Sequence, residues 1–139
     1  MHRDYLAVRL LLLSIVGGCL AFLLFSTPDT GGSRIMGEVM NCGHFVLFGV
    51  MAVSLFYFFE LGRPRGLRNH ALAWAITALL GLGTECIQLF QPLRSFELKD
   101  LANDALGALT FLAFVHSFAI AEGRKRFRLR IALAMICLL

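Results

Sequence analysis

Four long apolar runs, separated by short polar segments, dominate the pattern of hydrophobic and polar positions along the chain. Each run is close to the roughly 20 residues that a helix needs to cross the hydrocarbon core of a bilayer. Backbone polar groups must be satisfied internally in lipid, so the runs should be helices. The pattern therefore predicts an all-α, polytopic membrane protein with four transmembrane helices, at about residues 5–25, 39–59, 70–90 and 101–121.

The two ends of the chain need separate consideration. The first run follows a basic start, as in a signal peptide, but it continues through Leu20–Phe25, so we expect a retained helix. Residues 122–139 form a basic segment and a short apolar tail, which is too short to span a membrane. The tail either lies in the interface or begins a fifth helix of a longer chain. We expect a single transmembrane domain over residues 1–139.

Composition and charge support a membrane location. Hydrophobic residues make up 58% of the chain and charged residues only 16%, which argues against a soluble domain. The net charge of +4 comes from basic residues bunched between the apolar runs, so membrane topology explains it better than nucleic-acid binding. Ten of the thirteen basic residues share one side: Arg3, Arg9, Arg63, Arg65, Arg68, Arg124, Lys125, Arg126, Arg128 and Arg130.

This asymmetry predicts the orientation of the protein, because short cytoplasmic loops are rich in Lys and Arg. Both termini are expected to be cytoplasmic, and residues 26–38 and 91–100 are expected to face outward. The other side holds only Arg34, Arg94 and Lys99.

The cysteines give no sign of a metal or redox centre, since the four are scattered and none forms a C-x-x-C pair. Four residues could in principle ligate a metal, but nothing in their spacing demands it, so we expect neither metal nor cofactor. They are Cys42, His44, Glu85 and Cys86.

Polar side chains inside membrane helices are costly, and they are therefore candidates for function. Three of the predicted helices place such residues at one depth, near the outer face: His44, Glu85, Gln88, Asp100, Asn103 and Asp104. Glu85 and Gln88 are three residues apart and share a helical face. Arg94 lies in the short link between the third and fourth helices. The set forms either a ligand site or a network that only pairs with itself.

The stretch from Gly83 to Gly107, GTECIQLFQPLRSFELKDLANDALG, resembles the VanZ-like family. The matching residues are Glu85, Gln88, Phe90, Arg94, Asp100, Asn103 and Gly107, with His44-Phe45 upstream. The family often has Asp-Lys shortly before that histidine, whereas this chain has Met40-Asn41-Cys42, so any role of the Asp-Lys pair does not carry over. The resemblance covers about residues 35 to 120.

The resemblance implies a bacterial membrane protein of four or five helices, from a family named after a protein linked to resistance against the glycopeptide teicoplanin. The resemblance supports the membrane location and the choice of site residues but does not name a substrate. From the polar cluster near the outer face, we expect an inner-membrane protein that binds or modifies an envelope lipid or a lipid-linked precursor at the outer leaflet. Glu85 or His44 would transfer protons, and the ligand would be held by Gln88, Arg94, Asp100 and Asn103. The alternative is a non-catalytic interaction module with a structural polar cluster. The sequence leaves turnover and oligomeric state open.

Overall fold

The computed structural model describes residues 4–25, 34–62, 66–90 and 98–122. They form four helices: α1 (Asp4–Phe25), α2 (Arg34–Gly62), α3 (Leu67–Gln88) and α4 (Leu98–Glu122). Each helix contains a segment that is long and apolar enough to cross a membrane, and no strand occurs among these residues. The prediction of an all-α membrane protein with four spanning helices is confirmed.

Three helices begin earlier than the apolar pattern predicts. α2 begins at Arg34 rather than Val39, α3 at Leu67 rather than His70, and α4 at Leu98 rather than Leu101. The physical reason is that a helix is held by its backbone hydrogen bonds and can extend past the hydrocarbon core with polar side chains in its first turn. Hydropathy marks only the part of the helix that lies in lipid.

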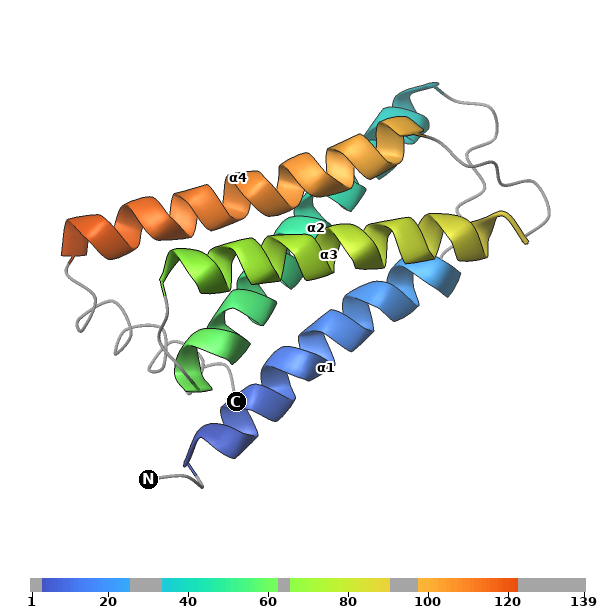
Figure 1. Cartoon of the computed structure of the whole chain (residues 1–139). Helices are drawn as coiled ribbons and strands as arrows, with labels where there is room; N and C mark the ends of the chain where they lie inside the picture. Colours follow the sequence, from blue (N-terminus) through green and yellow to red (C-terminus); the bar gives the residue numbers. More distant parts are fainter. Residues whose placement is uncertain (1–3, 26–33, 63–65, 91–97, 123–139) are drawn as a thin grey trace.

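The helices alternate in direction along the chain (Figure 1). α1 and α3 end, and α2 and α4 begin, at the same end of the bundle, which we call the site end. The other end, where α2 and α4 finish, is called the opposite end. α2 packs against all three of the other helices, and it crosses behind α3 and α4 in Figure 1.

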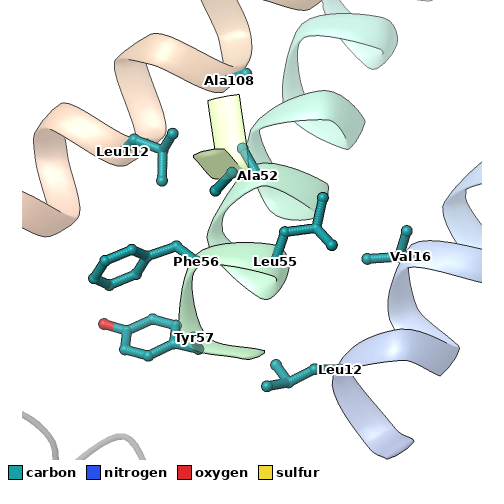
Figure 2. Close-up of a cluster of buried hydrophobic side chains, with 9 residues drawn as sticks. Leu12, Val16, Ala52, Leu55, Phe56, Tyr57, Ala108 and Leu112 are labelled. Carbon is teal, nitrogen blue, oxygen red and sulfur yellow. The ribbon is translucent and has the colours of Figure 1, made fainter. Parts of the chain in front are cut away.

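The main apolar core lies around the middle of α2, on the side of the opposite end. Its α2 members, Ala52, Leu55, Phe56 and Tyr57, contact side chains from the other helices (Figure 2). The partners are Leu12 and Val16 of α1, Ala73 of α3, and Ala108 and Leu112 of α4. Many large apolar side chains elsewhere are exposed, including Leu79 of α3 and Phe114 of α4, as expected for surfaces that face lipid.

Two glycines allow α2 and α4 to approach closely near the site end. A Cβ at Gly107 of α4 would collide with the backbone carbonyl of Phe45, and a Cβ at Gly49 of α2 would lie 2.5 Å from the ring of Phe111. Small residues at such crossings let helix backbones pack closely in membranes. Because Phe45 directly follows His44, this contact also determines where His44 lies relative to α4.

The buried face of α3 contains no large apolar side chain among the residues that are described. Its members are small or polar: Asn69, Ala73, Thr77, Gly81, Thr84, Glu85 and Gln88. The hydroxyls of Thr77 and Thr84 donate to carbonyls of their own helix, those of Ala73 and Gly81, at 2.8 Å each. This satisfies the hydroxyls internally and leaves α3 free to lie close to its neighbours.

Candidate functional site

The site end brings together an imidazole and a carboxylate from different helices. Nδ1 of His44, in α2, lies 3.4 Å from Oδ1 of Asp104, in α4. The Asp104 side chain is 0% exposed and that of His44 is 14% exposed. Asp104 therefore lies behind His44, and His44 lies nearer the surface of the bundle.

Asp104 is the residue that the sequence-based choice of site residues left out. It belongs to the polar stripe of α4, four residues after Asp100, but the sequence offered no reason to give it a role of its own. Its Oδ2 packs against α3, where a Cβ added to Gly81 would come within 3.1 Å of it. Neither carboxylate oxygen accepts a hydrogen bond from the residues that the structure describes.

Glu85 and Gln88 lie on the buried side of α3, as their spacing predicts. They are 1% and 4% exposed. Nε2 of Gln88 donates to the backbone carbonyl of Leu23, at the end of α1, over 3.3 Å. All four helices therefore contribute to this end, whereas the sequence had indicated polar groups from only three.

Asp100 and Asn103 lie in the first two turns of α4 and are partly exposed. An acidic residue in the first turn interacts favourably with the positive end of the helix dipole. Oδ1 of Asp100 is buried and accepts no hydrogen bond within the described part of the chain. Arg94 lies outside the described residues, so its expected network with Glu85 and Asp100 stays a prediction.

The bundle is also held together beside this site. Nε1 of Trp74, in α3, donates to the carbonyl of Ala105 in α4 at 3.1 Å, directly after Asp104 in the chain. Phe48, one turn after His44, is completely buried and its ring is stacked with that of His44 at 6.3 Å. These contacts limit the freedom of α4 and of the imidazole.

Three carboxyl groups act on the imidazole of His44, and Lys99 adjoins one of them, Asp100, in the chain. The charges of Asp104, Asp100 and Glu85 all act on the imidazole of His44, and the charge of Asp100 acts on Asp104. Electrostatic interactions of this kind are stronger inside a protein than in water, because the effective dielectric constant is lower. The site end thus combines one imidazole with three carboxyl groups.

Metal binding receives no support from the described side chains. Across residues 4–25, 34–62, 66–90 and 98–122, no group of three or more His, Cys, Asp or Glu residues is placed to hold a metal ion. Cys42 and Cys86, which the sequence analysis had considered, are free and exposed.

The chemical capacity of the site follows from the carboxylate–imidazole pair. A carboxylate beside Nδ1 favours the tautomer that carries its proton there, which leaves Nε2 as a hydrogen-bond acceptor or a base. Such a pair can accept a proton or hold a hydrogen-bond donor of a ligand.

The fold and the composition of the four helices define the class of the chain, which is a multi-pass α-helical membrane protein. Residues 16–119 of the 139 match the model of the VanZ/LLP1 family, and the chain belongs to that family. This confirms the resemblance noted in the sequence, and an association with the cell envelope and antibiotic resistance fits the family context. No curated protein and no solved structure matches the chain.

Proposed function

We propose that this VanZ/LLP1 protein binds or modifies an envelope lipid, or a lipid-linked precursor, through the polar cluster at the site end. His44 or Glu85 would transfer a proton, with Gln88, Asp100 and Asn103 orienting the ligand. Arg94, which the sequence places in the adjoining link, would hold a phosphate or carboxylate group.

One observation above all supports this proposal, which is the state of Asp104. A carboxylate that is 0% exposed, and whose one charged partner among the described residues is the His44 imidazole 3.4 Å away, is expensive to bury. An apolar side chain would serve packing as well or better at lower cost. The carboxylate of Asp104 fixes the tautomer and orientation of the half-buried His44 imidazole, so that its other nitrogen can interact with a ligand. This is a functional reason for burying Asp104.

We also propose that the protein lies in the bacterial inner membrane with both termini in the cytoplasm, so that the site end faces the outer leaflet. The support is the distribution of Lys and Arg along the chain. In a cysteine-free background, Arg65→Cys should resist an impermeant thiol reagent in intact cells, whereas Arg34→Cys should react. The reverse labelling pattern would overturn this orientation.

The proposed site is tested by three substitutions, Glu85→Gln, Arg94→Ala and Asn103→Ala. We expect each to abolish the contribution of the protein to glycopeptide susceptibility while folded protein stays near the wild-type level. Glu85→Gln is the sharpest of the three, because it keeps the shape and most of the hydrogen bonding but removes charge and proton exchange.

Quantified folded protein in membranes is the measurement that separates the two candidate functions. The second candidate is a non-catalytic interaction module whose polar cluster is structural. The hydrogen bond from Gln88 to Leu23 favours it, because this contact joins α3 to α1 and stabilises their packing. In that case loss of function should follow loss of protein, and Arg94→Ala should be the most damaging because it leaves carboxylates without a counter-charge. Proportional loss of both would therefore reject the site.

A further inference from the structure

We propose that the ligand presents a primary ammonium group to Asp100, Asp104 and His44, as the headgroup of an aminophospholipid would. This inference rests on the proposed function and names the chemical class of its ligand. The support comes from unmet acceptors, from the sign of the local charge, and from the depth of the site.

The unmet acceptors are carboxylate oxygens on two successive turns of α4. Both oxygens of Asp104, and Oδ1 of Asp100, are buried and accept no hydrogen bond from any described residue. Residues four apart on a helix lie on the same face and are neighbours. An ammonium group carries three donors and no acceptor, so it complements the partly exposed Asp100 directly and the buried Asp104 through its charge.

The charge of the site favours a cation beside Asp100, Asp104 and His44. Asp104, Asp100 and Glu85 all act electrostatically on His44, so carboxylates outnumber the imidazole three to one. Even a protonated His44 would leave more negative than positive charge there if the carboxylates are ionised. An ammonium group there would be attracted to the carboxylates and would form charge-assisted hydrogen bonds, while the phosphate of the same lipid would lie toward Arg94.

The depth of the site fits a lipid headgroup. His44 lies about five residues inside the apolar run 39–59, and Asp100 directly precedes the apolar run 101–121. At about 1.5 Å per residue, His44 is attached roughly 7 Å inside the start of its run, and Asp100 is attached at the edge of its run. That is the boundary between hydrocarbon and headgroups.

Access to the site is graded in a way that suits a headgroup arriving from the bilayer. Asp100 is partly exposed, His44 is 14% exposed, and Asp104 is completely buried behind it. A lipid could therefore bring its ammonium to the half-buried side chains at the edge without leaving the membrane. Asp104 would act on the ammonium through its charge and through His44.

Lipid selection by the purified full-length chain tests this directly. The protein is exchanged into vesicles of phosphatidylethanolamine, phosphatidylcholine and phosphatidylglycerol in equal amounts with identical acyl chains, and the lipids it retains are measured by mass spectrometry. We expect the protein to retain roughly ten times more phosphatidylethanolamine than phosphatidylcholine. A tenfold ratio corresponds to the free energy of about one charge-assisted hydrogen bond. Phosphatidylcholine is the matched control, because it has the same net charge but no N–H donor.

Two isosteric variants locate the selectivity. Asp100→Asn and Asp104→Asn should each reduce the preference for phosphatidylethanolamine to nearly equal retention, since both remove a charge and preserve shape. Glu60→Gln is the control, because it neutralises a buried carboxylate at the opposite end of the bundle. A thermal unfolding curve for each variant shows that the comparison is made on folded protein.

Several results would overturn the inference. Equal retention of the three lipids by the wild type would do so, as would a preference for phosphatidylglycerol or a preference that both Asn variants keep. A different result is that the wild type selects no lipid but is stabilised by Na⁺ or K⁺, with that stabilisation lost in Asp104→Asn. This result would assign Asp100, Asp104 and His44 to an inorganic cation. If an anionic lipid is retained and Glu85→Gln releases it, the proposed lipid site stands and only the ammonium is rejected. Retention of no lipid would reject both.

Discussion

The two ends of the bundle both bury carboxylates, but the surroundings of these groups differ. At the opposite end, Oε2 of Glu60 accepts a hydrogen bond from Nδ2 of Asn69 at 2.7 Å, and both residues are buried. At the site end, Asp104 is buried more completely, yet its oxygens accept no hydrogen bond from the described residues. Buried polar groups are normally satisfied when they serve only structure. The contrast is that Glu60 is paired with a neutral amide, whereas the partner of Asp104 is an ionisable imidazole.

The histidines at the two ends differ in the partner of Nδ1. At the opposite end, Nδ1 of His70 donates to the carbonyl of Gly66 at 3.0 Å, at a turn where Gly66 has a φ of 54°. The ring of His70 packs at 4.1 Å from that of Phe56 and at 5.0 Å from that of His116. His44, by contrast, faces a carboxylate. The difference suggests ways to change stability at one end and function at the other.

The largest expected effect on stability comes from the close contact between α2 and α4. Gly107→Ala places a Cβ against the backbone carbonyl of Phe45, which cannot move as a flexible side chain could, so the helices must separate. We expect a loss of about 3 kcal/mol in the free energy of unfolding, and a displaced His44. Chemical unfolding in detergent measures the loss.

The control for this substitution is Gly83→Ala, in α3, where an added Cβ meets nothing within 4 Å. It should stay within about 1 kcal/mol of the wild type. Similar losses from the two alanines would show that close packing at Gly107 is unimportant.

An intermediate effect is expected when the buried bond at the opposite end is removed. Asn69→Ala removes one hydrogen-bond donor from the buried Glu60, so we expect a loss of about 2 kcal/mol in unfolding free energy. Asn103→Ala, on the partly exposed part of α4, should cost less than about 0.5 kcal/mol but remove function. The comparison of unfolding curves with glycopeptide susceptibility tests this pair. If Asn103→Ala proved to be the more destabilising change, the division between the two ends would be wrong.

A small effect on stability is also expected at Asp104 itself. Asp104→Asn removes a buried negative charge that accepts no hydrogen bond from the described residues, and the lost attraction to His44 is offset by the lower desolvation cost. The unfolding free energy should change by less than about 1 kcal/mol, although function is lost. A decrease of several kcal/mol in the unfolding free energy, measured by thermal or chemical unfolding, would instead show that the His44–Asp104 pair serves stability.

The fold was predictable from the sequence because hydropathy alone distinguishes segments that must lie in lipid. All four spanning helices and the single-sided set of polar residues follow from it. The helix starts were less predictable, as the early beginning of α2 at Arg34 shows, since polar residues can continue a helix beyond the apolar span. Family membership adds independent support, because the match covers residues 16–119.

The candidate site was predictable only in part. Its depth and the burial of Glu85 and Gln88 follow from position and spacing along their helices. The pairing of His44 with Asp104, and the bond from Gln88 to α1, do not, because each joins helices distant in sequence. Which α4 carboxylate faces His44 depends on the rotation of that helix, and a periodic pattern in one helix says nothing of its neighbour.

By itself, the sequence determined that this chain crosses a membrane four times and places His44, Glu85, Gln88 and Asp104 toward one end, because the cost of exposing polar groups to lipid acts on each segment separately. Only the tertiary structure decided which of those residues meet. The contact of Gly107 with Phe45 brings α4 against α2, and Gly81 leaves room beside α3 for a buried carboxylate, so that Asp104 faces His44. The rotation and separation of the helices depend on how small and large side chains of different helices fit together. The sequence of one helix does not contain this information.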